Sequence, residues 1–352
     1  MTSVIPIANI YYLYCYAWER FAEGKALAVG VENSPDLPNL LARVLVNGIQ
    51  GLFRRGLDRV YVPLVEDLAT VRGHIEMGAS LRLQARRIKR VKCLHDELSH
   101  DVLHNQILKT SLRQLCAQPR LTEALKEEAQ SIIRRMHDVS DIRLTQSCFA
   151  RVQLNRNSAY YDLLLKVAQL TFKMLLPVPG AGGYMFHDIT RDEREMARVF
   201  ETFVRNFYKV EQSEFEVLPL TIIWDAFPLE HARAQRLPSM RADVFLRSPQ
   251  RQLIIDTKYY VEALQAYRGI TSFRSENLYQ LFSYLKNHNP KIPSGTQLDG
   301  MLLYPQVGSQ FDSKFTIQGN TVRLSTLDLG RPWQEISERL LSLISNARPN
   351  NQ

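Results

Sequence analysis

The sequence has few cysteines and no long apolar run, and these two absences limit the class of protein. Four cysteines occur in 352 residues, at Cys15, Cys93, Cys116 and Cys148, and none forms a C-x-x-C pair. We therefore expect reduced, mostly buried thiols in a cytoplasmic protein. No stretch reaches the roughly 18 uncharged apolar residues that span a bilayer, so no membrane association is expected.

Several motifs of nucleotide and hydrolase chemistry are also missing. No G-x-x-x-x-G-K-[ST] occurs, so the chain is not itself a P-loop NTPase. No G-x-S-x-G occurs, and the glycines of 180–183 fail the dinucleotide-binding pattern. The spacing of Cys93, His95, His100 and His104 matches no common set of zinc ligands.

A strong charge of one sign is absent as well. The chain has 44 Lys and Arg against 36 Asp and Glu, a formal net charge of +8, and 45% of its residues are hydrophobic. This composition is globular, and the length allows two domains. The small positive excess favours an anionic partner such as nucleic acid, but many soluble proteins reach it without one.

The chain divides most naturally at the segment PVPGAGGY, residues 177–184, which carries two prolines and three glycines after a predicted helix. We predict an α+β domain over 1–178. A second domain over 185–352 has the order helix, strands, helix, strand, which predicts an α/β fold around a mixed central sheet. A basic run over 82–92 is either a phosphate-binding strip or the solvated face of an amphipathic element.

The strongest chemical signal is MRADVFLRSPQRQLIIDTKYY in the second half. Asp243 begins one predicted strand, and Asp256 and Lys258 end the next, after an apolar run. Side chains alternate between the two faces of a strand, so Asp256 and Lys258 lie on one face, and a hairpin can bring Asp243 beside Asp256. Two carboxylates and a lysine suit phosphodiester hydrolysis with Mg²⁺, which takes a few carboxylates plus water and phosphate oxygens. The expected metal ligands are Asp243, Asp256 and the backbone carbonyl of Thr257.

The order of the surrounding elements supports a nuclease interpretation of this short motif. A helix with Glu201 precedes it, and a helix with Gln280 and Tyr284 in a Q-x-x-x-Y spacing follows it. This order resembles the PD-(D/E)xK restriction-endonuclease-like fold in its RecB-like variant. By this resemblance Glu201 is a candidate catalytic acid, in the place of the glutamate that some of these nucleases carry on their first helix, and Gln280 and Tyr284 either contact the DNA backbone or buttress the site. Alternatives remain for each residue: a surface hairpin with ordinary salt bridges, a solvated helix charge at Glu201, and a core tyrosine at Tyr284.

Further segments resemble a particular family, the McrC nuclease subunits of McrBC modification-dependent (type IV) restriction systems. The likeness runs over nearly the whole chain, and its most specific part is the N-terminal string. The segments are IPIANIYYLYCYAW (5–18), FRRGLDRVY (53–61), VRGHIEM (71–77), DVLHNQILK (101–109) and ENLYQLFSYL (276–285).

The resemblance implies a function shared with a partner. It implies that 1–178 docks on a hexameric AAA+ GTPase like McrB and stimulates its nucleotide hydrolysis. It implies that 185–352 cuts double-stranded DNA with modified cytosine, with Asp243, Asp256 and Lys258 as the catalytic positions. The aromatic residues of 11–18 either anchor the partner or pack in the protein's own core.

Two other functions remain open on the residues alone. The chain could be an autonomous PD-(D/E)xK nuclease of DNA repair, which needs no partner. It could also be a non-catalytic activator of an AAA+ ring, in which Asp256 and Lys258 have no chemical role.

Overall fold

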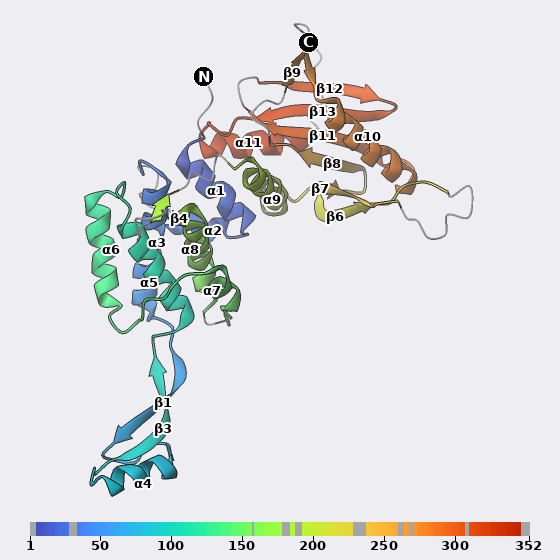
Figure 1. Cartoon of the computed structure of the whole chain (residues 1–352). Helices are drawn as coiled ribbons and strands as arrows, with labels where there is room; N and C mark the ends of the chain where they lie inside the picture. Colours follow the sequence, from blue (N-terminus) through green and yellow to red (C-terminus); the bar gives the residue numbers. More distant parts are fainter. Residues whose placement is uncertain are drawn as a thin grey trace. The chain divides into compact units, whose positions relative to one another are not determined.

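The structure is a computed structural model, and it describes residues 5–27, 34–156, 158–177, 184–186, 192–227, 237–259, 264–267, 270–306 and 310–345. The chain forms two compact units. Unit 1 contains Met1–Lys25 and Asp188–Gln352, and unit 2 contains Ala26–His187 (Figure 1). No described helix is long and apolar enough to cross a membrane.

The division differs from the predicted one because the first 25 residues belong with the C-terminal half. Helix α1 (Ile7–Ala17) packs on α9 (Glu193–Glu211), where the Tyr16 ring contacts Phe203. The Asn206 side chain donates a hydrogen bond to the Tyr16 carbonyl, 2.9 Å away. Tyr16 is 2% exposed, so the core reading of this aromatic residue is confirmed.

The predicted linker also proves to be flanked by paired strands. Strand β4 (Leu175–Pro177) pairs antiparallel with β5 (Tyr184–Phe186), both in unit 2. Residues 178–183 lie outside the described part of the chain. The division between the units falls after His187, beyond the predicted linker.

Unit 1 is built on a six-stranded sheet with the order β12-β13-β11-β8-β7-β6. β11 runs parallel to β8 and β13, and the other neighbours are antiparallel, so the predicted mixed sheet is confirmed. The strands are β6 (Glu216–Ile222), β7 (Met240–Arg247), β8 (Arg251–Thr257), β11 (Gln297–Pro305), β12 (Asp312–Ile317) and β13 (Asn320–Leu327).

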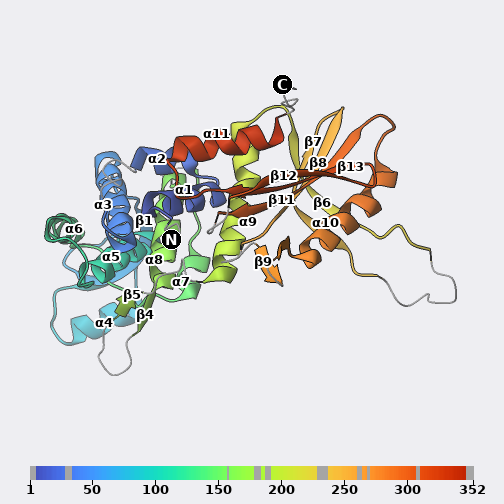
Figure 2. The same cartoon turned by 90° about the horizontal axis from the view of Figure 1, so that it is seen from above.

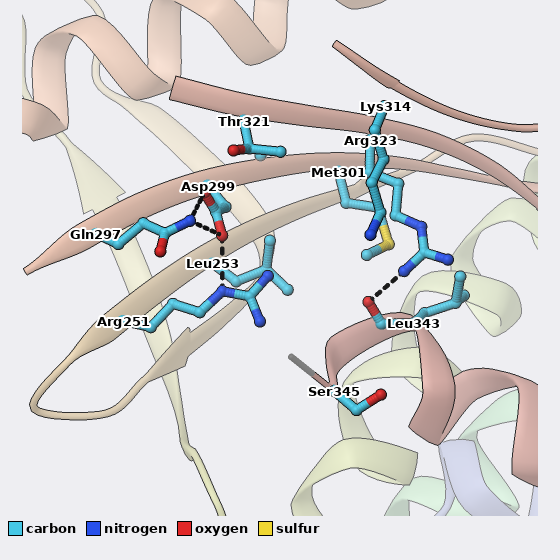
Figure 3. Close-up of a pocket in the computed structure, with 11 residues that line it drawn as sticks. Arg251, Leu253, Gln297, Asp299, Met301, Lys314, Thr321, Arg323, Leu343 and Ser345 are labelled. Carbon is cyan, nitrogen blue, oxygen red and sulfur yellow. Dashed lines mark hydrogen bonds and ion pairs between the residues drawn. The ribbon is translucent and has the colours of Figure 1, made fainter. Parts of the chain in front are cut away.

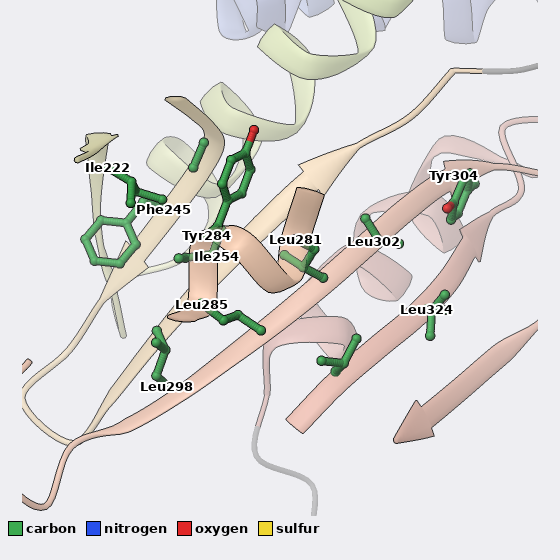
Figure 4. Close-up of a cluster of buried hydrophobic side chains, with 12 residues drawn as sticks. Ile222, Phe245, Ile254, Leu281, Tyr284, Leu285, Leu298, Leu302, Tyr304 and Leu324 are labelled. Carbon is green, nitrogen blue, oxygen red and sulfur yellow. The ribbon is translucent and has the colours of Figure 1, made fainter. Parts of the chain in front are cut away.

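Helices cover both faces of this sheet. Figure 2 shows α10 (Ser275–His288) and α11 (Trp333–Ile344) on opposite faces. Beneath α10, Leu281 and Leu285 pack with Ile254, Leu302 and other apolar side chains of the sheet (Figure 4). The short helix α2 (Phe21–Leu27) begins in unit 1 and ends two residues past the division at Lys25. Unit 1 also contains the paired strands β9 (Leu264–Tyr267) and β10 (Ile270–Phe273).

Unit 2 combines a helical body with a projecting sheet, in agreement with its predicted α+β character. The body contains α3 (Leu37–Arg55), α5 (Leu103–Cys116), α6 (Glu123–Arg135), α7 (Gln146–Arg151) and α8 (Asp162–Met174). α3 begins where the Asp36 carboxylate accepts a hydrogen bond from the Asn39 amide, 3.0 Å away, and it ends at Gly56 with φ +88°.

The projecting sheet, which we call the finger, has the strand order β1-β3-β2. Figure 1 shows β1 (Val60–Leu68) and β3 (Val91–Ser99) leaving the helical body, with α4 (Met77–Ala85) at the far end. β2 (His74–Ile75) completes it. Most of the predicted basic run lies on α4 and the turn after it.

Candidate nuclease site

The β7–β8 hairpin brings the two aspartates together, as the sequence predicts. The strands are antiparallel, and Val244 opposite Ile255 is their last pair before Asp243 and Asp256. A tight turn closes the other end, where the Ser248 amide donates to the Arg251 carbonyl, 2.8 Å away. The apolar run of β8 is buried along its length, which holds this register.

A β-bulge sets the direction of the first aspartate. The β6–β7 register shifts so that Pro219 alone opposes Asp243 and Val244. Proline has no N–H to donate to the ladder, so a bulge is a position that tolerates it. Bulges occur beside active sites because they redirect a side chain. Here Asp243 Oδ2 accepts hydrogen bonds from the backbone N–H and the hydroxyl of Thr257, both at 2.8 Å.

Asp256 is the most buried acid of the site. Its exposed fraction is 0%, and Lys258 Nζ forms an ion pair with its Oδ2 at 2.7 Å. Its Oδ1 is buried and accepts no hydrogen bond from any residue that the structure describes. Burial, followed by the charge of Asp243, raises the pKa of Asp256 to about 6, against the lowering influence of Lys258.

A chain of hydrogen bonds runs from Lys258 to the start of β7. Lys258 Nζ donates to Gln280 Oε1 at 2.9 Å, and Gln280 Nε2 donates to the Tyr284 hydroxyl. The Tyr284 hydroxyl donates in turn to the Arg241 carbonyl at 3.1 Å. The Q-x-x-x-Y spacing therefore holds the lysine, because both side chains lie on one face of α10.

Glu201 lies at the margin of this cluster. It forms an ion pair with Arg205, one helical turn further along α9. Burial and the charge of Asp243 raise the pKa of Glu201, and Arg205, Arg241 and Lys258 oppose that rise. The structure thus brings Glu201 within electrostatic reach of the aspartates.

A polar cleft of about 530 Å³ lies elsewhere in unit 1. Its lining includes Leu253, Met301 and Arg323 (Figure 3). Leu302 pairs with Asp256 on the neighbouring strand, so the two side chains share one face of the sheet. Met301, the residue before Leu302, points to the opposite face, and the cleft therefore opens on the face away from Asp256. Both of its arginines are already bound: Arg251 pairs with Asp299 at 2.6 Å, and Arg323 donates to the Leu343 carbonyl.

Sequence reasoning missed three contributors to the site. The hydroxyl and amide of Thr257 hold Asp243, whereas only its carbonyl was predicted to take part, and that role stays a prediction. Arg205 could have been found from its i, i+4 spacing to Glu201. Arg241 had no signal beyond its closeness in sequence to Asp243, because its relation to Tyr284 arises only in the fold.

An α/β unit with two converging aspartates and a lysine at adjacent strand ends defines a class of candidate phosphodiester-cleaving proteins. Comparison with known proteins then gives the family. Residues 10–305 match the family described as McrBC 5-methylcytosine restriction system component. A curated relative, the type IV methyl-directed restriction enzyme EcoKMcrBC of Escherichia coli (strain K12), is 31% identical over 340 residues, which are 97% of each chain.

A solved structure agrees in fold. It is the refined half-complex from a tetradecameric assembly of Thermococcus gammatolerans McrB AAA+ hexamers with bound McrC. The similarity has a TM-score of 0.61 at 18% identity and covers 97% of this chain and 76% of that one. The chain belongs to the McrBC 5-methylcytosine restriction system component family, as its sequence predicted.

Proposed function

We propose that this chain is the DNA-cutting subunit of its restriction system, with unit 1 as a PD-(D/E)xK endonuclease. The observation that carries the proposal is the convergence of Asp243, Asp256 and Lys258 at the ends of β7 and β8. A purely structural hairpin would not bury Asp256 completely with one oxygen lacking a hydrogen bond, because such a group destabilises the fold.

The acidic residues fit a hard divalent cation. Within the described ranges, no group of three or more His, Cys, Asp or Glu side chains is placed to hold a metal. Two carboxylates remain, which suits Mg²⁺ because it keeps several water or phosphate ligands. We propose that Asp243, Asp256 and the Thr257 carbonyl hold it; when bound, it polarises the phosphate and lowers the pKa of an attacking water.

The remaining side chains orient these groups. Thr257 holds the Asp243 carboxylate through two hydrogen bonds. Lys258 offsets the charge that develops on the phosphate and orients the attacking water. Gln280, held by Tyr284, fixes the position of the lysine ammonium.

Unit 2 is the proposed docking part. The finger exposes large apolar side chains on β1 and β3, with Tyr61 at 68%, Val65 at 52% and Leu98 at 39%. Contiguous exposed apolar surface marks interaction sites. We propose that it binds a hexameric AAA+ GTPase and stimulates nucleotide hydrolysis, since this chain has no P-loop of its own. The proposed DNA substrate carries modified cytosine.

The test uses the full chain assembled with its AAA+ partner on methylated DNA. Asp256→Asn and Lys258→Ala are each expected to lower the cleavage rate more than about 100-fold, because each removes a group at the reacting phosphate. Stimulation of the partner's GTPase should survive. Lys286→Ala, on the same sheet face but bonded to the Gln318 carbonyl, is the matched control.

Two outcomes would contradict parts of this proposal. Full cleavage by both variants would make the chain a non-catalytic activator. Robust cleavage by the wild-type chain alone with Mg²⁺, without partner or nucleotide, would make it an autonomous nuclease.

A further inference from the structure

Arg241 is an exposed cation at the edge of the proposed nuclease site. It lies on β7, two residues before Asp243 and next to the bulge. No carboxylate within the described part of the chain forms an ion pair with its guanidinium. Arg205 and Lys258, the other cations acting on Glu201, are each paired with an acid.

The backbone of Arg241 is fixed to the same network as the lysine. The Tyr284 hydroxyl donates to the Arg241 carbonyl at 3.1 Å, and Tyr284 also accepts from Gln280, which binds Lys258. Hydrogen bonds therefore fix the backbone of Arg241 and the ammonium group of Lys258, while the Arg241 side chain remains exposed to solvent.

A polyanion approaching this site needs such a group. Glu201, Asp243 and Asp256 together repel phosphate. Unit 1 offers little general attraction, because it contains 22 Lys and Arg against 21 Asp and Glu, a net charge of +1. Individually placed cations must then supply the attraction, and arginine suits phosphate through its planar set of N–H donors.

We propose that Arg241 binds a backbone phosphate of DNA next to the one that is cut. This inference rests on the proposed nuclease function of unit 1. It assigns Arg241 to binding, and it assigns Tyr284 a second role as the residue that sets the distance between Arg241 and Lys258.

The first experiment measures binding without cleavage. A 20-base-pair duplex is titrated with the full chain in EDTA at several salt concentrations. Arg241→Gln is expected to weaken binding about three- to tenfold and to reduce the slope of log affinity against log salt by about one. Arg241→Lys should keep most of the affinity, since it retains the charge.

The matched control is Arg247→Gln. Arg247 lies at the other end of β7, is exposed, and is ion-paired with Glu216 at 2.6 Å. The Arg247→Gln substitution changes the net charge as much as Arg241→Gln does, but it should leave the DNA affinity and its salt dependence within twofold of the wild type. Tyr284→Phe, which changes no charge, should weaken binding less than Arg241→Gln.

The assembled complex supplies an independent measurement. Arg241→Gln should raise the KM for DNA about three- to tenfold and change kcat less than threefold. Equal behaviour of Arg241→Gln and Arg247→Gln in both assays overturns the inference, as does weaker partner assembly with unchanged DNA binding. If Arg241→Gln weakens DNA binding while Asp256→Asn still supports full cleavage, Arg241 binds DNA but unit 1 is not the nuclease. That result rejects the nuclease assignment, and with it the placement of the bound phosphate next to the one that is cut.

Discussion

Two fully buried polar side chains, one in each unit, differ in whether their hydrogen-bonding groups find partners. In unit 2, Asn105 is fully buried, and its amide donates to the carbonyls of Asp58 and His100 while its oxygen accepts from Tyr161. In unit 1, Asp256 is equally buried, yet one of its oxygens accepts no hydrogen bond from the described residues. The hydrogen bonds of Asn105 stabilise unit 2, whereas the unpaired oxygen of Asp256 costs stability, which the proposed metal site explains.

The two units also differ in net charge. Unit 2 contains 22 Lys and Arg against 15 Asp and Glu, a net charge of +7, and unit 1 carries +1. The positive excess of the chain therefore lies in the unit without the aspartate pair. Net charge gives no indication of where phosphate chemistry takes place, because a few placed cations suffice at a site.

The largest effect on stability is expected from Asn105→Ala. Three hydrogen bonds disappear and buried partners lose their donor or acceptor, so the free energy of unfolding of unit 2 should fall by about 3 kcal/mol. Urea-dependent hydrogen exchange of unit 2 peptides measures it. Gln130→Ala, at an exposed position of α6, should stay within about 0.5 kcal/mol of the wild type. An equal loss of unfolding free energy in Asn105→Ala and Gln130→Ala would show that the hydrogen bonds of Asn105 do not stabilise unit 2.

Asp256→Asn should act in the other direction. The pKa of Asp256 rises from 3.8 to about 6 on folding, so the folded state loses stability as the pH rises through this range. Without metal at pH 8, Asp256→Asn should stabilise unit 1 by on the order of 1–3 kcal/mol, and the gain should vanish below about pH 4.

Thermal melts in EDTA across this pH range are the measurement. Asp225→Asn, at an exposed position of unit 1, is the control and should show no such pH dependence. A lower melting temperature for Asp256→Asn at pH 8 would show that Asp256 contributes to stability in the same way as Asn105.

The smallest effect on stability is expected from Tyr61→Ser in the finger. Tyr61 is 68% exposed, so its replacement should change the free energy of unfolding by less than about 0.5 kcal/mol. Partner affinity should nevertheless fall about tenfold or more, since tyrosines are frequent hot spots of interfaces. Sedimentation with the AAA+ hexamer measures this, and unchanged assembly would place the partner contact elsewhere.

Local patterns were enough to predict most elements of unit 1. The strands that carry Asp243 and Asp256, the helix with Gln280 and the mixed sheet all follow from apolar periodicity and short connections. In the finger, β3 was missed because its sequence, VKCLHDELS, alternates weakly and mixes charged residues into both faces.

Long-range pairing decided what local patterns left open. The sequence by itself determined which residues carry the candidate chemistry, because an apolar strand ending in D-x-K and a Q-x-x-x-Y helix are properties of neighbouring residues. Only the tertiary structure placed α1 in unit 1, through contacts with residues about 190 positions away. It also decided that Asp243 points to Thr257 and that Tyr284 binds Arg241, since a bulge and a helix on a sheet depend on packing between distant segments.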